Sequence, residues 1–106
     1  MARRDTTPRL TVIYWRDIPA QVRATAGRER AAAALPERFM VAIDRAAMIA
    51  DKKKVDEYVA EWREETRQCG PDLQSEADLE AQRIVSDHPQ SLVRAYVKNG
   101  GWAPEE

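Results

Sequence analysis

Residues 10–15 form the clearest strand pattern in the chain, because all of them are leucine, β-branched or aromatic. Side chains of a strand alternate between its two faces. Here the alternation gives two largely apolar faces, with Leu10, Val12 and Tyr14 on one and Thr11, Ile13 and Trp15 on the other. We therefore expect a central strand that is covered on both sides, or on one side and by a partner on the other.

A turn is predicted at residues 16–19, since Pro19 lacks an amide hydrogen and disfavours helical geometry at the residue before it. Residues 21–25 predict a second strand that pairs with the first as a hairpin. Residues 28–35 are ambiguous, because their alanines favour a helix whereas Pro36 penalises helical geometry just before it. We predict an extended third strand there, with a helix as the alternative.

From Pro36 onwards apolar residues recur every three or four positions, which indicates an amphipathic helix that ends near the lysines at 52–54. A second helix is predicted over residues 54–65, and residues 64–69 are a short strand in the alternative. The apolar face of this second helix consists of Val55, Tyr58, Val59 and Trp62.

Two more helices are expected in the last third of the chain. Ser75 and Asp78 resemble a capping box for the third helix. Asp87 is positioned to cap a fourth, which has Pro89 in its first turn and ends at residues 99–101. The sequence thus predicts an α+β fold, in which a small antiparallel sheet (an N-terminal hairpin and a possible third strand) packs against three to four helices.

The chain of 106 residues has the size of one domain, and 43% of its residues are hydrophobic and 33% charged, as in globular proteins. We expect a disordered arm at residues 1–8, a single domain at 9–102 and a loose tail at 103–106. With one cysteine, no apolar leader and no apolar run of bilayer length, the sequence indicates a soluble cytoplasmic protein without a membrane partner.

The formal net charge is −1, from 17 basic and 18 acidic residues. A nearly neutral chain attracts polyanions weakly, which argues against nucleic acid as a partner. Charge is nevertheless unevenly placed, because arginines gather between residues 3 and 45 and acids between 57 and 80. This pattern leaves room for a basic face.

Reactive residues are sparse. The single histidine, His88, and the single cysteine, Cys69, are too few for a usual zinc site, and they are read as structural unless the fold brings them together as a nucleophile and base. The carboxylates lie opposite the apolar stripes and are read as solvated: Glu57, Glu61, Glu64, Glu65, Glu76, Asp78 and Glu80. No glycine-rich phosphate loop is present, so no nucleotide cofactor is predicted. Taken together, these residues predict neither a cofactor nor a catalytic residue.

The segment from Tyr14 to Pro19 stands out, because two aromatic residues are followed at once by Arg16, Asp17 and a rigid proline. Strand ends often carry binding residues, and Trp and Arg are typical interface anchors. The candidate binding residues are Tyr14, Trp15, Arg16 and Asp17, together with Arg38 from the first helix. The favoured interpretation places Tyr14 or Trp15 in the core and makes Arg16 and Asp17 local turn chemistry; in the alternative, Trp15 and Trp102 are surface anchors, whereas Trp62 is predicted as core.

Residues 11–22 (TVIYWRDIPAQV) resemble the opening signature of a small bacterial family named virulence factor. The stretches 35–39, 42–48 and 58–63 are similar to later parts of it, so that the resemblance covers about residues 10–100. The family's domain occurs alone in short proteins, and as the last part of larger conserved virulence factor C proteins. The resemblance implies an accessory role, near iron–sulfur or one-carbon metabolism, without an assigned reaction.

These observations favour a non-catalytic accessory or protein-interaction domain of a bacterial metabolic or virulence-associated system, with another protein as its partner. The alternative is a small-molecule-binding subunit of a cofactor-dependent enzyme system, which predicts one pocket lined by Tyr14 and Arg38. Nucleic-acid binding through the arginine-rich first third is a third hypothesis, and the net charge argues against it.

Overall fold

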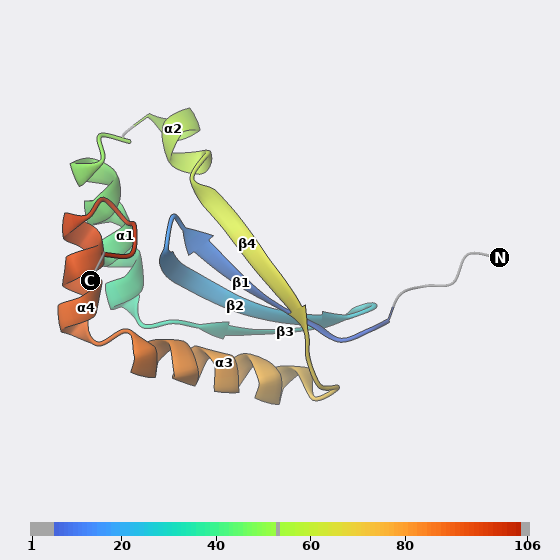
Figure 1. Cartoon of the computed structure of the whole chain (residues 1–106). Coiled ribbons are helices and arrows are strands. Elements are labelled where there is room, and N and C mark those ends of the chain that lie inside the picture. Colours follow the sequence, from blue (N-terminus) through green and yellow to red (C-terminus); the bar gives the residue numbers. More distant parts are fainter. Residues whose placement is uncertain (1–5, 53, 105–106) are drawn as a thin grey trace.

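Four antiparallel strands form a twisted sheet in the order β3-β2-β1-β4, with helices along one face and across one end (Figure 1). The computed structural model describes residues 6–52 and 54–104. The elements are β1 (Arg9–Trp15), β2 (Ile18–Ala26), β3 (Glu29–Ala34), α1 (Glu37–Ile49), α2 (Val55–Val59), β4 (Trp62–Gln68), α3 (Leu73–Asp87) and α4 (Gln90–Lys98). The predicted α+β fold is confirmed, and β1 is a central strand of the sheet.

The N-terminal hairpin is tighter than predicted. Only Arg16 and Asp17 form the turn, and β2 begins at Ile18, directly opposite Trp15. Pro19 is accommodated because the pairing register shifts beside it, and such a bulge leaves a residue without ladder bonds. The alanine-rich segment is extended, as predicted, since β2 offers a complete antiparallel edge that overrides the helix propensity of alanine.

The main core lies between the sheet and α3. Leu10, Val12, Val22 and Ala24 face Ala77, Ala81 and Ile84, and all of them are buried. Helix α3 runs mainly under β2 and β3 (Figure 1), where alanines allow the helix to approach the strands closely. The large residues of this interface each contribute about 1.5–3 kcal/mol through burial.

A second part of the core lies at the end of the sheet that α1 crosses. The predicted stripe of α1 is buried there: Phe39, Ala42, Ile43, Ala46 and Ala47. Helix α4 packs beside α1, and the two run in the same direction, because Arg38 in the first turn of α1 contacts His88, just before α4, while Ala50 contacts Gly100, just after it. Two helices that share a direction therefore form one side of the molecule (Figure 1).

The predicted helix over residues 54–65 is wrong for most of its length. Helix α2 has only five residues, and the chain turns into β4 at Trp62. Val55 and Val59, predicted to be buried, are 78% and 55% exposed. The strand alternative for residues 64–69 is closer, because the free edge of β1 pairs with Trp62–Gln68 along its whole length.

The predicted caps of the last two helices are also wrong. Helix α3 begins at Leu73, and the carboxylate of Asp72 accepts the amide hydrogen of Ser75 at 3.2 Å. Asp87 still belongs to α3, and Pro89 precedes α4 without any side-chain cap. Helix α3 therefore begins about one turn earlier than the predicted cap at Ser75 indicates.

Parts of the predicted arm and tail lie outside the described residues, namely 1–5 and 105–106. Within the described part, the carbonyl of Pro8 accepts the amide of Cys69 at 3.1 Å, and the amide of Ala103 donates to Asp17 Oδ2 at 2.7 Å. No helix in the described ranges has the length and apolarity needed to cross a bilayer.

Candidate functional site

The Arg16–Asp17 turn joins three segments that are distant in sequence. The Arg16 amide donates to the Glu61 carbonyl at 3.0 Å, and the Asp17 amide donates to the Gly101 carbonyl at 2.8 Å. Arg63, from β4, donates to the Arg16 carbonyl at 2.8 Å and to the Asp17 carboxylate at 3.0 Å. The turn thus holds the start of β4 and the loop after α4 against the hairpin.

The side chain of Arg16 is enclosed, with only 11% of it exposed. Its guanidinium lies over the rings of Trp15 and Trp102, at 5.2 and 4.9 Å from their centroids. It donates to the Gly100 carbonyl at 2.9 Å and pairs with Glu61, whose Oε2 lies 3.3 Å from Nε. That Nε contact is electrostatic, because its geometry does not meet that of a hydrogen bond.

Trp15 is fully buried, so the interpretation that places it in the core is confirmed and the surface-anchor alternative is wrong for this residue. Its indole N–H donates to the Tyr58 carbonyl at 2.8 Å, and its ring stacks on that of Tyr58. Trp62, predicted as core, is half-buried beside Tyr58, and Trp102 is 45% exposed. The segment between α1 and β4, together with the C-terminal loop, covers Trp15, which strand alternation cannot show.

Tyr14 is half-buried on the face of the sheet that α3 covers, with the Arg63 guanidinium 4.3 Å from its ring centroid. It lines a hollow of about 220 Å³ between β1, β4 and α3. Burial, reinforced by the nearby carboxylate of Glu65, raises the pKa of the Tyr14 hydroxyl.

Glu80, on the wall of the same hollow, was expected to be solvated but is only 7% exposed. Its carboxylate accepts from Arg83 at 2.6 Å and from Arg67 of β4 at 3.1 Å. Glu80 can be buried because β4 lies beside α3 and supplies Arg67, the cation that a buried carboxylate needs. This bridge fastens an edge strand to α3.

Arg38 does not join the turn residues. It donates to the His88 carbonyl at 3.1 Å, and its guanidinium lies over the Phe39 ring. Tyr14 and Arg38 line separate hollows, so the predicted pocket lined by both is not formed.

The imidazole of His88 has structural neighbours. It contacts the Ile84 carbonyl through Nδ1 at 2.7 Å and packs edgewise on Phe39 and Tyr96. Cys69 precedes α3 and His88 follows it, and a helix of 15 residues separates them by about 22 Å. They are therefore not a nucleophile and its base. Burial raises the pKa of the Cys69 thiol, which further lowers its reactivity.

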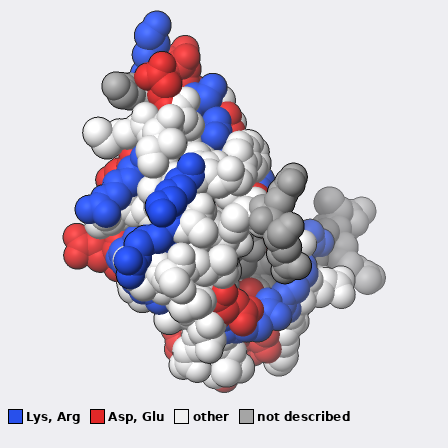
Figure 2. Space-filling model, turned by 60° about the vertical axis from the view of Figure 1, so that its left-hand side comes forward, with Lys and Arg blue, Asp and Glu red and all other residues white. Residues whose placement is uncertain are grey.

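Arg38 instead belongs to a groove on the outer side of α1 and α4, with a volume of about 450 Å³. We call it the α1–α4 groove; its lining residues are Glu37, Arg38, Val41, Ala42, Arg45, Gln90, Val93, Arg94, Val97 and Lys98. The valines and the alanine give it an apolar floor, and four of the other residues are basic. Figure 2 shows basic side chains gathered among uncharged residues on the α1 and α4 side.

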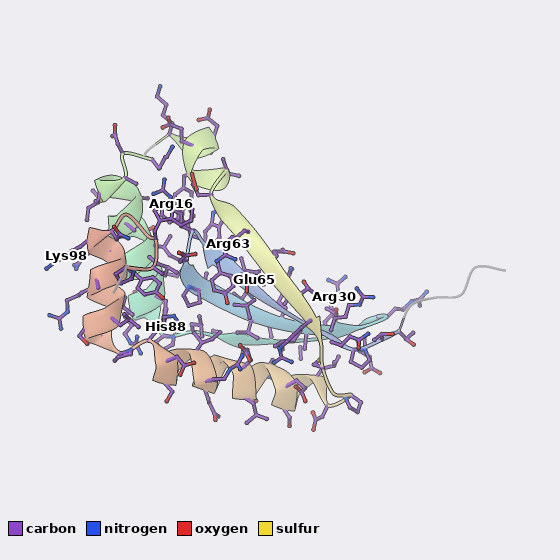
Figure 3. The ribbon with its side chains drawn as sticks, viewed as in Figure 1. Arg16, Arg30, Arg63, Glu65, His88 and Lys98 are labelled. Carbon is purple, nitrogen blue, oxygen red and sulfur yellow. The ribbon has the colours of Figure 1, made fainter. Side chains whose placement is uncertain are left out.

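Three of these cations, Arg45, Arg94 and Lys98, have no ion-pair or hydrogen-bond partner among the described residues, and all three are exposed. Lys98 extends from α4 away from the sheet, whereas Arg16 and Arg63 lie close together near the turn (Figure 3). Glu37 is the one acidic residue among the described residues that line the groove. The groove is therefore locally positive although the chain is nearly neutral.

Sequence reasoning missed this groove apart from Arg38. The signal is the spacing of three and four between Arg38, Val41 and Arg45, which places them on one stripe of α1. Arg94, Val97 and Lys98 repeat that spacing on α4. Their combination into one surface depends on the packing of α1 against α4.

No three His, Cys, Asp or Glu side chains gather in a metal-binding arrangement within residues 6–52 and 54–104. In comparisons with known proteins, the family model described as virulence factor matches residues 13–97. Neither a curated protein nor a solved structure matches the chain.

Proposed function

The chain belongs to the virulence factor family, and we propose that it is a non-catalytic protein-interaction module whose docking surface is the α1–α4 groove. The observation that carries this proposal is an apolar floor bordered by four basic side chains, three of which (Arg45, Arg94 and Lys98) have no ion-pair or hydrogen-bond partner among the described residues. Interface cores combine apolar contact area with arginine, and a surface that leaves both uncovered is suited to a partner.

The distribution of the reactive groups supports a role without catalysis. Cys69 and His88 lie at opposite ends of α3, and the carboxylate of Glu80 is held by two arginines. A catalytic site brings a nucleophile or base to a position that substrate reaches. His88 and Glu80 instead bind groups of the fold itself, the Ile84 carbonyl and two arginines.

The small-molecule alternative stays a prediction, and no observation favours it over the interaction module. The hollow beside Tyr14 is small and lined by charges already paired with each other. A thermal-shift screen against folates, corrinoids and nucleotides tests it, because a ligand that binds the folded state raises the melting temperature.

The proposed function is tested by affinity capture from an extract of the source cells, with mass spectrometry of the retained proteins. Val41, on the groove floor, is replaced in Val41→Asp, and the matched control is Leu79→Asp on α3, since both side chains are exposed, at 39% and 61%. We expect Val41→Asp to lose a protein that the wild type and the control retain, with unchanged circular dichroism. Retention of the same proteins by all three would remove the groove as the docking surface.

A further inference from the structure

We infer that the partner presents an acidic amphipathic helix, which lies lengthwise in the α1–α4 groove. This inference rests on the proposed function and specifies the chemistry of the segment that docks.

The shape suits a helix. Two helices that run side by side in the same direction leave a furrow between them, and a third helix fills such a furrow by ridge-into-groove packing. Helix α1 has 13 residues and is thus about 20 Å long, which matches about three and a half to four turns of a partner helix. Val41 on α1 and Val97 on α4 leave apolar surface uncovered on the two walls of the groove, which suits the apolar stripe that a helix presents at i, i+3 or i+4, and i+7.

The charges select an acidic partner. Arg45, Arg94 and Lys98 lie beside the valines and form no ion pair among the described residues, and Glu37 is the one carboxylate among the lining residues, so that positive charge is in excess there. Carboxylates on either side of a partner's apolar stripe balance that excess and form charge-assisted hydrogen bonds. Helices α1 and α4 also begin at the same end, where no side chain caps them, which adds the positive ends of two helix dipoles.

A polyphosphate backbone fits less well than a helix. Nucleic-acid surfaces gain affinity from many cations that follow a backbone. Here the floor is apolar, the basic residues number four, and the carboxylate of Glu37 lies among them. An apolar stripe between two rows of charge is a feature of a peptide helix and not of a phosphate chain.

The experiment selects phage-displayed random peptides of about 16 residues, enough for a helix along α1, on the full chain. The wild type is compared with Arg45→Glu/Arg94→Glu in the groove. The matched control is Arg28→Glu/Arg30→Glu, which makes the same charge change at two exposed positions, one in the β2–β3 connection and one at the start of β3. The highest-ranking peptide is then synthesised and its binding measured by fluorescence anisotropy at low and high salt.

We expect the wild type and the control to enrich acidic peptides with an apolar i, i+3, i+4, i+7 stripe, and the groove variant to bind the synthesised peptide at least ~10-fold more weakly. Binding to the wild type should also weaken as salt rises. Enriched peptides without acidic bias, equal binding by the groove variant, or tighter binding of an oligoribonucleotide of similar length would each overturn the inference. If Val41→Asp still abolishes capture in that case, the proposed function stands; if both experiments are negative, both fall.

Discussion

The Arg16–Asp17 turn and the α1–α4 groove both contain arginines beside apolar side chains, aromatic at the turn and aliphatic in the groove, but their arginines differ in what they bind. In the turn, Arg16 and Arg63 are paired with carboxylates and main-chain carbonyls of the chain itself. In the groove, Arg45 and Arg94 have no ion-pair partner among the described residues. The difference teaches that residue type alone does not mark a binding site; the presence or absence of a partner within the fold does.

The contacts of the turn therefore stabilise the fold. It connects the hairpin to β4 through the Glu61 carbonyl and to the C-terminal loop through Gly101 and Ala103. In the groove, Arg38 bonds to the His88 carbonyl before α4, whereas the exposed side chains of Arg45, Arg94 and Lys98 form no ion pair or hydrogen bond among the described residues. Changes near the turn should reduce the free energy of unfolding, and charge changes in the groove should leave it almost unaltered.

The largest expected effect is that of Trp15→Ala. The change removes a fully buried ring, its stacking on Tyr58 and its hydrogen bond to the Tyr58 carbonyl. We expect a loss of about 3–5 kcal/mol in the free energy of unfolding, measured by urea denaturation. Trp102→Ala is the control, since that ring is 45% exposed and covers the same arginine from outside. Equal losses for the two tryptophans would show that Trp15 is not the centre of this part of the core.

Gly101→Ala should follow in size. Gly101 has φ +98°, and a Cβ there would lie 2.8 Å from Cζ3 of the buried Trp15 ring, which cannot move aside. We expect a loss of about 2 kcal/mol or more by the same denaturation assay. Gly27→Ala is the matched change at positive φ, but its Cβ meets only the exposed side chain of Thr6, at 3.1 Å. It should cost about 1 kcal/mol, and a reversed order would contradict the close packing of the loop on Trp15.

The sequence predicts those elements whose burial depends on neighbouring residues, and it does not predict those that depend on contacts between residues far apart in the chain. Strand β1 and helix α1 follow from periodicity, because their burial is decided within a few residues. Strand β4 does not, since its charged residues are extended only because the edge of β1 pairs with them. The burial of Trp15 likewise depends on a carbonyl 43 positions away.

The groove shows the same limit. Each of its two stripes is visible in the sequence as a spacing of three and four, but only the packing of α1 on α4 makes them one surface. Arg38 was singled out from sequence and does line the groove, whereas Tyr14, Trp15, Arg16 and Asp17 lie elsewhere in the structure. Short-range patterns thus predict elements, and long-range pairing decides which charges are satisfied.

A pH titration sharpens the contrast at the turn, because Tyr14 lies beside it. Burial raises the pKa of the Tyr14, Tyr58 and Tyr96 hydroxyls above the usual value of 10.0. The folded protein then holds these protons more tightly than the unfolded chain does. The contribution of these hydroxyls to stability is therefore complete below pH 10 and is lost as pH rises beyond it, because the unfolded chain loses these protons first. Urea denaturation across this range should show a shallower decline for Tyr14→Phe, and an unchanged decline would exclude Tyr14 as a contributor.

The smallest effect on stability is expected in the groove itself, for Arg45→Gln and Arg94→Gln. Neither guanidinium has an ion-pair or hydrogen-bond partner to lose within the described residues, and each change weakens the repulsion among neighbouring cations. We expect changes within about 0.5 kcal/mol, on the stabilising side, as at surfaces whose composition serves binding at some cost in stability.

Arg63→Gln is the matched change at the turn. It removes the bonds to the Arg16 carbonyl and the Asp17 carboxylate and should cost about 1–2 kcal/mol. Urea denaturation of the three variants side by side decides whether the turn arginine stabilises the fold and the groove arginines do not. Similar losses for Arg45→Gln and Arg63→Gln would mean that the groove arginines also hold the fold together and are not reserved for a partner.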